Sequence, residues 1–351
     1  MARSAFPKLD DTILRLLPDH PKDLVSAVAA KMGASRPTVS TAIRRLEALG
    51  LLQSEGTTRK IYSPTTFKWH GRIDSALDES LVWQKHFSAQ LAKLPENQRD
   101  ILHYGLTEML NNVRDHSEGK RADIMLSMRP DAVAFSIADD GEGIFRRIAR
   151  LQKLPDEKLA LLELAKGKLT TDPKNHSGEG IFFSSRVFDE FTIYSSELLF
   201  THDETQDALH DAELPEPLKK NDKGTVVSML LARESKRTLR DVFDRYAAPA
   251  EFTFSKTLVP LRLARLGNEN LLSRSQAKRA LARVDQFKVV VFDFTEVPLI
   301  GQGFADEIFR VFANAHPDIE LIPAHFNDEV RRMLLHVGVT QKQLQTKTEL
   351  T

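Results

Sequence analysis

The 351-residue sequence contains no cysteine. Disulfide bonds and thiolate-bound metal sites are therefore excluded, and a reducing compartment is compatible with the chain. No stretch approaches the roughly 18 consecutive apolar residues that a membrane-spanning helix needs. The first residues, MARSAFPKLDD, also lack the apolar core of a signal peptide. We expect a cytoplasmic protein with no membrane partner.

The sequence also lacks a net charge, because 49 Lys and Arg residues balance 49 Asp and Glu residues. Any nucleic-acid binding must therefore come from a local basic surface. Internal repeats and low-complexity tracts are absent as well. At about 100–200 residues per domain, the length predicts two or three domains. The order of expected helices, strands and turns along the chain predicts a multidomain α+β protein with domains at 1–66, 67–250 and 251–351.

Residues 1–66 have the pattern of three short helices followed by a β-hairpin. The helices are expected at 9–18, 22–33 and 35–50, with Ser35 as an N-cap and Gly33 and Gly50 as stops. The hairpin is expected at 51–64, around Gly56. This order resembles a winged helix-turn-helix domain.

The third of these helices and the hairpin present the side chains that double-stranded DNA requires. Short hydroxyl groups at a helix start suit entry into the major groove, and basic residues suit phosphate contacts. The expected DNA-binding residues are Ser35, Arg36, Thr38, Ser40, Thr41, Arg44 and Arg45 on the helix, with Arg59 and Lys60 on the wing. The alternative is a small dimerisation module whose arginines are merely solvated.

Residues 67–250 alternate helices with strands of period two. Helices are expected at 76–95 and 98–117, strands at 122–129 and 132–139, and a helical insert at 145–174. A glycine turn then starts another helix, and a hairpin at 190–204, a polar loop and a closing strand at 224–231 follow. This order predicts an α/β sandwich, in which helices cover one face of a mixed sheet.

The helix at 98–117 carries an unusual polar face. Glu108, Asn112 and His116 are four residues apart, so their side chains project from one side. The apolar residues that would pack the opposite side are Leu106, Met109, Leu110 and Val113. The polar face either is solvated or faces a site that needs a base and a metal ligand.

Three further motifs follow that helix in a fixed order, namely DDGEGI from Asp139, GEGI from Gly178 and KGT from Lys223. Each motif alone is weak, because Gly-x-Gly turns are common, whereas the four elements in this order are specific. Together they resemble the GHKL (Bergerat-fold, histidine kinase-like) ATPases, the superfamily of gyrase, MutL, histidine kinases and anti-sigma kinases. The resemblance covers roughly residues 84–231.

The resemblance implies that the central domain binds ATP with Mg²⁺. Asn112 would coordinate the metal ion, and one amide oxygen is enough because Mg²⁺ keeps waters and phosphate oxygens as its other ligands. Glu108 would orient or deprotonate the nucleophile that attacks the γ-phosphate. His116 would contact phosphate.

The glycine motifs have implied roles at the base and the triphosphate. Asp139 would accept a hydrogen bond from the adenine amino group, and Ile144 would pack on the purine. Gly141 and Gly143 would let the backbone pass close to the base. The remaining implied contacts are Ser177, Gly178 and Gly180 around a helix start that receives the triphosphate, and Thr225, which braces Asp139. The insert would be the ATP lid, and its Lys166, Lys168 and Lys174 would face either phosphate or solvent.

Residues 251–351 alternate strand and helix, and the run DFTEVPLIGQGFADEIF (293–309) looks like a STAS-like α/β domain. STAS switch proteins usually present a phosphorylatable serine where the central strand meets its helix. This chain has Ile300, Gly301, Gln302 and Gly303 there, which counts against a serine switch and favours a simple tight turn. The domain could still contact a protein partner.

Two functions are compatible with this organisation. The first is an ATPase that acts as a nucleotide-dependent DNA-binding regulator, with ATP state coupled to the geometry of a homodimer. The alternative is a serine kinase of the anti-sigma type that acts on a STAS-like partner or domain. The dimer contact is expected along residues 76–94, where Leu77, Leu81, Phe87 and Leu91 form an apolar stripe, unless that stripe packs on its own domain. A conventional sensor histidine kinase is disfavoured, because His86 lacks the acidic neighbour and downstream proline of a phosphoacceptor.

Overall fold

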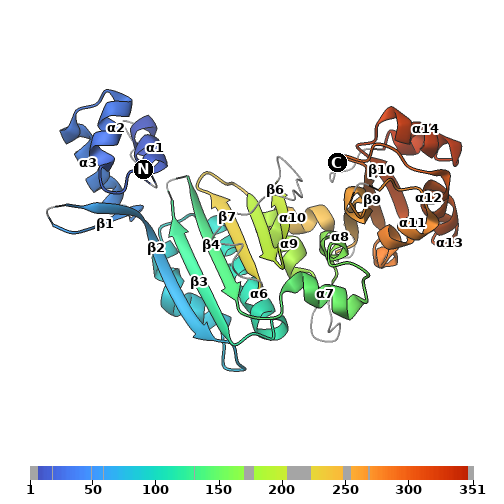
Figure 1. Cartoon of the computed structure of the whole chain (residues 1–351), viewed down its shortest axis with the longest axis horizontal. Coiled ribbons are helices and arrows are strands. Elements are labelled where there is room, and N and C mark those ends of the chain that lie inside the picture. Colours follow the sequence, from blue (N-terminus) through green and yellow to red (C-terminus); the bar gives the residue numbers. More distant parts are fainter. Residues whose placement is uncertain are drawn as a thin grey trace.

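The computed structural model describes residues 7–17, 19–48, 50–57, 59–129, 131–169, 178–203, 223–247, 254–267 and 269–346. Three parts follow one another along the long axis of the molecule (Figure 1). A small helical part lies at one end, a large sheet in the middle, and a second α/β part at the other end.

The N-terminal part consists of three helices and a hairpin, in the order that the sequence predicts. Its elements are α1 (Pro7–Leu16), α2 (Leu24–Met32), α3 (Arg36–Ala48), β1 (Leu52–Glu55) and the start of β2 (Ile61–Arg72). The backbone N–H of Thr38 donates to the Ser35 hydroxyl at 3.3 Å, which confirms Ser35 as the N-cap. Gly33 ends α2 with a left-handed φ of 62°. This part has its own hydrophobic core, which includes Ile13, Leu24, Val28, Val39 and Ile43.

Strand β2 is shared between the N-terminal part and the central sheet. Its first four residues pair with β1, and Thr65–Arg72 pair with β3 (Arg121–Met128), in both cases antiparallel. The boundary expected at residue 66 therefore falls inside one continuous strand. The two parts are joined by shared hydrogen bonds and not by a linker.

The central sheet has seven strands in the order β1-β2-β3-β4-β7-β5-β6. Its remaining strands are β4 (Ala132–Asp139), β5 (Glu190–Ser195), β6 (Leu198–Asp203) and β7 (Val226–Ala232). Every neighbouring pair is antiparallel, so the mixed sheet expected from the sequence is wrong. The strands β4 and β5 do run in the same direction and are joined by helices. However, β7 inserts between them, and Met229 pairs with both Phe135 and Phe191.

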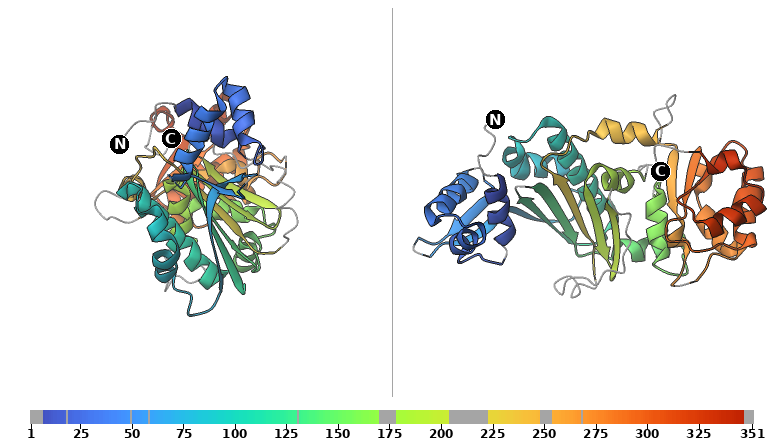
Figure 2. Two further views of the ribbon diagram at one scale, coloured as in Figure 1. Left: turned by 90° about the vertical axis from the view of Figure 1, so that its left-hand side faces the viewer. Right: turned by 90° about the horizontal axis from the view of Figure 1, so that it is seen from above.

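The helices of the central part cover one face of this sheet (Figure 2). They are α4 (Glu79–Val82), a π-helical turn η1 (Trp83–Phe87), α5 (Ser88–Leu91), α6 (Glu96–His116), α9 (Gly180–Val187) and α10 (Leu239–Tyr246). The apolar side of α6 is buried against the sheet, as expected. Along β3, buried and exposed side chains alternate, which is typical of a sheet with one solvated face.

The apolar stripe expected to form a dimer contact instead packs on its own domain. Leu77, Phe87 and Leu91 are buried in the central core, and only Leu81, which is 46% exposed, reaches solvent.

The C-terminal part is built on a three-stranded parallel sheet in the order β10-β9-β8. Its strands are β8 (Lys256–Pro260), β9 (Val289–Asp293) and β10 (Glu320–Ala324). Its helices are η2 (Leu261–Ala264), α11 (Arg274–Leu281), η3 (Val284–Gln286), α12 (Gln302–Asp306), η4 (Glu307–Phe312), α13 (Ala313–Ala315), α14 (Asp328–His336) and α15 (Gln341–Leu344). Val290, Val291 and Phe292 are fully buried, as expected for a strand covered on both faces.

The turn before α12 has a packing explanation. The Gly301 N–H donates to the Leu271 carbonyl at 2.8 Å, and a Cβ at this position would lie 2.7 Å from the Leu272 carbonyl oxygen. The glycine is therefore required by close backbone packing, which agrees with the simple tight turn. In the described ranges, no helix combines the length and the apolar character needed to cross a bilayer.

Candidate functional site

A cavity of about 160 Å³ lies between α6, the end of β4, the start of β7 and the helices that follow β4. Those helices are α7 (Ile144–Gln152) and α8 (Leu159–Lys166), which we call the lid. The cavity is lined by the expected site residues Glu108, Asn112, His116, Asp139, Gly143, Ile144, Gly178, Gly180 and Thr225. Gly141 does not line it, and Ser177 lies outside the described residues.

The polar face of α6 faces this cavity and is not a solvated surface. Met109 and Val113 line the cavity beside the three polar residues, so the wall is partly apolar. The Glu108 carboxylate lies against the start of α9, because a Cβ at Gly180 would be only 2.1 Å from Glu108 Oε2. The free N–H groups at a helix start favour a negative charge. A carboxylate and an anion-binding helix start thus share one end of the cavity.

Asp139 is a buried carboxylate at the end of β4, with 8% of its surface exposed. Its Oδ1 accepts a hydrogen bond from the Gly141 N–H at 2.8 Å. Burial raises the pKa of Asp139 to about 6, although hydrogen bonds from the backbone N–H groups of Gly141 and Thr225 oppose this shift. Asp139 is therefore a buried hydrogen-bond acceptor on the cavity wall.

The glycines of the first motif shape the loop after Asp139. A Cβ at Gly141 would lie 2.0 Å from the Ser117 carbonyl oxygen, at the end of α6. That carbonyl accepts from the Glu142 N–H at 2.9 Å. Gly141 therefore allows the loop to pack on α6, which differs from the expected approach to a base. Gly143 does line the cavity, and its φ of 94° favours glycine.

Thr225 connects β7 to both sides of the first glycine motif. Its hydroxyl accepts from the Ile144 N–H at 3.0 Å, and its carbonyl accepts from the Asp139 N–H at 3.0 Å. The expected brace, from the Thr225 hydroxyl through water to Asp139 and the adenine, stays a prediction, whereas the contacts seen here are direct ones. They hold Asp139 and Ile144 on neighbouring parts of the cavity wall.

The oxygen donors of the cavity fit a magnesium ion that is bound together with phosphates. Asn112 supplies an amide and Glu108 a carboxylate on the same wall. Among the described residues, no group of three or more His, Asp or Glu side chains could hold a metal ion by itself. Mg²⁺ does not need such a group, since one or two protein oxygens and phosphates suffice.

Sequence reasoning missed the cavity residues that come from the lid and the segment just after it. They are Arg147, Ile148, Leu164, Gly167 and Leu169. Arg147 is 17% exposed and forms an ion pair with Glu118. Its helical spacing of three from Ile144 was a usable signal, because residues i and i+3 share a helix face. The positions of Leu164 and Gly167 carry no such local signal.

The lysines expected on the lid do not face the cavity. Lys166 is fully buried, and its ammonium donates to Glu163 Oε1 and to the Ala282 carbonyl, each at 2.7 Å. Lys168 donates to the Gln286 carbonyl at 2.9 Å. Lys166 therefore faces neither phosphate nor solvent, and Lys168 is half-buried beside Gln286, because the outer side of the lid packs on the C-terminal part. Lys174 lies outside the described residues.

The raised pKa of Asp139 predicts a pH-dependent cost in stability. Between the ordinary value of 3.8 and about 6, the folded protein binds more protons than the unfolded chain, so stability falls as pH rises through this window. Asp139→Asn should therefore gain about 2–3 kcal/mol relative to wild type between pH 3.5 and pH 7, since one pKa unit is about 1.4 kcal/mol. Chemical denaturation of both ligand-free proteins at these two pH values measures the change. A difference that is constant with pH would contradict it.

Comparison with known families agrees with the geometry. Residues 76–199 match the histidine kinase-like ATPase domain, and residues 276–331 match a STAS-like domain of unknown function (DUF4325). The curated proteins contain no match to the chain. Neither family match covers residues 1–75. The chain thus contains a histidine kinase-like ATPase domain of the GHKL type, followed by a STAS-like domain.

Proposed function

We propose that this protein is an ATP-dependent DNA-binding regulator, whose central domain binds and hydrolyses Mg²⁺-ATP. The observation that supports the nucleotide site is the presence of two carboxylates at one cavity. Asp139 is buried among backbone donors, and Glu108 lies at the start of α9. The first is suited to recognise a base and the second to act on a phosphate.

Different cavity residues contact the base, the triphosphate and the attacking water. Asp139 accepts a hydrogen bond from the adenine amino group, and Ile144 packs on the ring. The backbone at Gly178 and Gly180 receives the triphosphate at the start of α9. Asn112 would hold the magnesium ion, which would supply positive charge to neutralise the phosphates. Glu108 orients the attacking water and removes its proton.

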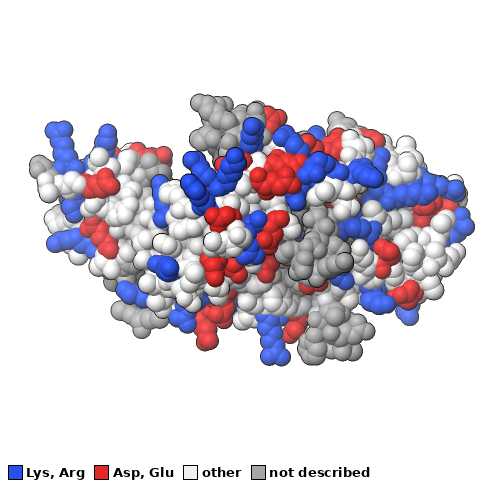
Figure 3. All heavy atoms as spheres, turned by 90° about the horizontal axis from the view of Figure 1, so that it is seen from below, with Lys and Arg blue, Asp and Glu red and all other residues white. Residues whose placement is uncertain are grey.

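The DNA-binding surface is the exposed side of α3 together with the wing. Ser35, Arg36, Thr38, Thr41 and Arg44 are exposed on α3, Ser40 is half-buried there, and Arg59 and Lys60 are exposed on the wing. Lys and Arg side chains project from the end of the molecule that carries this part (Figure 3). Such side chains are suited to phosphate contacts.

Two of the basic residues are engaged by acidic neighbours. Arg45 donates to Asp10 Oδ2 at 2.7 Å, so its guanidinium holds α3 against α1. The Lys60 ammonium lies 3.6 Å from Glu47 Oε1, a looser pair. We therefore assign the main phosphate contacts to Arg44 and Arg59, and a packing role to Arg45. A homodimer on a two-fold DNA site doubles these contacts.

DNA binding is tested by fluorescence anisotropy with a mixed-sequence duplex over a salt series, without nucleotide, with ADP and with a non-hydrolysable ATP analogue. The Arg44→Ala, Arg59→Ala double variant should bind more weakly, and the slope of log affinity against log salt should fall by about 2, one for each lost phosphate contact. Nucleotide state should change the wild-type affinity several-fold at fixed salt.

The matched control is Arg240→Ala, because Arg240 is exposed on α10 and pairs only loosely with Asp244 at 3.5 Å. This control should bind as wild type does. Absence of DNA binding in all three nucleotide states would contradict the proposal and leave the N-terminal part as a protein-interaction module. Sedimentation of the same samples reports whether the bound species is a dimer.

A further inference from the structure

Helix α8 of the lid has two sides with different neighbours. Leu164 and the adjoining Gly167 line the cavity. Glu163 and Lys166 instead contact the C-terminal domain, where Arg283 and Thr257 meet them. One short helix thus forms part of the cavity wall and part of the contact between domains.

The contact between α8 and the C-terminal domain is a buried polar cluster, which we call the clamp and define as Glu163, Lys166, Thr257 and Arg283. Arg283 donates to Glu163 Oε2 at 2.8 Å and to the Glu163 carbonyl at 2.9 Å. It also donates to the Gly167 and Lys168 carbonyls at 3.1 and 2.8 Å. The Thr257 hydroxyl donates to the Lys166 carbonyl at 2.7 Å. The C-terminal domain thus satisfies the Glu163 and Lys166 carbonyl groups in the last turn of α8, and those of Gly167 and Lys168 just after it.

Burial makes the clamp a strong constraint. The side chains of Lys166, Glu163 and Arg283 are 0%, 5% and 16% exposed. The cluster holds two cations and one carboxylate, so removing Arg283 leaves Glu163 with Lys166 as its charged partner and frees the carbonyl groups that Arg283 holds. Phe254 adds an apolar contact, since its ring lies 4.2 Å from that of Phe182, a residue of the cavity wall. The position of α8 is therefore set by the C-terminal domain.

The position that the clamp imposes on α8 narrows the cavity. Sites for ligands of this size usually enclose about 300–1,000 Å³, whereas the cavity here measures about 160 Å³. Leu164, Gly167 and Leu169 form the wall of the cavity next to the clamp, and α8 packs in the same hydrophobic core as α6 and the sheet. A nucleotide larger than the cavity would have to move this wall, which the clamp holds in place.

We propose that the STAS-like domain is an autoinhibitory regulator of the ATP site, which it restrains through the clamp on α8. The proposal rests on the ATP site proposed above. Because coupling between two equilibria is reciprocal, ATP binding loosens the clamp, and any partner that detaches the STAS-like domain raises the affinity for ATP. Through α8, ATP binding then changes the contacts of the C-terminal domain.

The test is calorimetry of a non-hydrolysable ATP analogue on the full chain carrying Arg283→Ala or Thr257→Val. Arg283→Ala should bind the analogue at least about fivefold more tightly than wild type, the lower end of typical coupling between sites. Thr257→Val removes a single hydrogen bond of the clamp and should give a smaller shift in the same direction. Hydrogen exchange should be faster in α8 of both variants.

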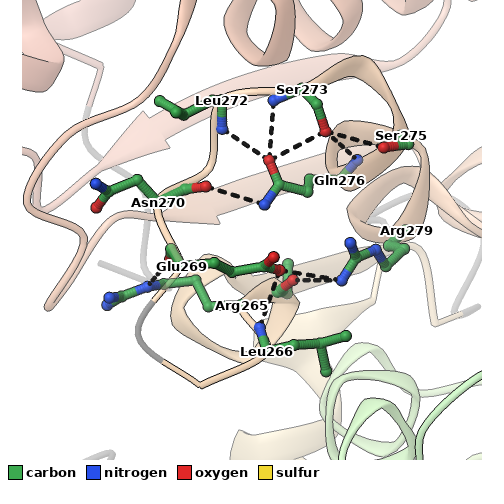
Figure 4. A network of polar contacts seen from close by, with 10 residues as sticks. Arg265, Leu266, Glu269, Asn270, Leu272, Ser273, Ser275, Gln276 and Arg279 are labelled. Atoms are coloured by element: carbon green, nitrogen blue, oxygen red, sulfur yellow. Dashed lines mark hydrogen bonds and ion pairs between the residues drawn. The ribbon is translucent and has the colours of Figure 1, made fainter.

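The matched control is Arg279→Ala. Arg279 belongs to the same domain, but its side chain pairs with Glu269 at 3.3 Å inside a separate network (Figure 4). The affinity of the Arg279→Ala variant for the ATP analogue should stay within about twofold of wild type, since this substitution leaves the clamp side chains intact. A general weakening of the C-terminal domain would instead shift all three variants alike, which would overturn a specific clamp.

The outcomes separate the clamp from the ATP site. Wild-type protein that gives no binding heat would remove the ATP site, and the inference with it. Normal wild-type binding with unchanged or weaker binding in Arg283→Ala would overturn the clamp alone. If Arg283→Ala does not fold, Thr257→Val decides, and an unchanged affinity in that variant overturns the inference.

Discussion

Asp139→Asn is expected to weaken binding of an ATP analogue at least about a hundredfold. The backbone N–H groups of Gly141 and Thr225 both donate to the carboxylate. In the variant they would hold the amide oxygen, so the amide NH₂ group would face the adenine amino group. Two donors would then oppose each other in a buried site, which costs more than the loss of one hydrogen bond. Titration calorimetry of wild type and variant at pH 7.5 measures the change.

Asp140→Asn is the matched control for this substitution. Asp140 is the next residue, and its carboxylate also accepts from two backbone N–H groups, those of Lys120 and Arg121, at 2.7 and 2.9 Å. It does not line the cavity. The control should bind the analogue normally. An Asp139→Asn protein that keeps its affinity within about threefold would show that this carboxylate does not recognise the base.

Glu108→Gln is expected to lower ATP turnover by about a hundredfold or more and to leave affinity for the analogue nearly unchanged. A general base contributes roughly 10²–10⁴ to rate, and the amide has the shape of the carboxylate but cannot take a proton. The size of the side chain matters, because Gly180 leaves no room beyond the Glu108 carboxylate. Phosphate release and calorimetry on the same preparation separate catalysis from binding.

Glu142→Gln serves as the control, because Glu142 belongs to the first glycine motif but pairs with Arg150 at 2.6 Å outside the cavity. Full turnover by Glu108→Gln would contradict the assignment of the base. Label from [γ-³²P]ATP that remains on the protein, in place of free phosphate, would favour a serine kinase of the anti-sigma type over a hydrolase.

The site was predictable to the extent that its residues carry local signals. Glu108, Asn112 and His116 share a helix face because of their spacing, and Asp139 ends a strand of clear alternation. The order of the motifs then placed Gly178, Gly180 and Thr225 near them. All of these residues line the same cavity.

What the sequence did not reveal are contacts between distant segments. The insertion of β7 between β4 and β5 depends on strands about 90 residues apart in the chain, and no local pattern encodes it. The contacts of Arg45 with Asp10, and of Lys166 with the Ala282 carbonyl, turned two apparently solvated cations into structural ones. A basic residue on a helix looks the same in sequence whether water or a carboxylate lies opposite it.

Strand β2 has a consequence for how any DNA-binding surface could be aimed. At about 3.3 Å per residue, its 12 residues form a rod of roughly 40 Å that belongs to both parts of the molecule. Strand β2 pairs with β1 along Ile61–Pro64 and with β3 along Thr65–Arg72, so α3 and the nucleotide cavity are linked through one continuous strand. One inserted residue in the middle of β2 would turn the side chains after it to the opposite face of the sheet. Under the proposed function, the orientation of the DNA-binding surface relative to the ATP site would therefore depend on the register of β2.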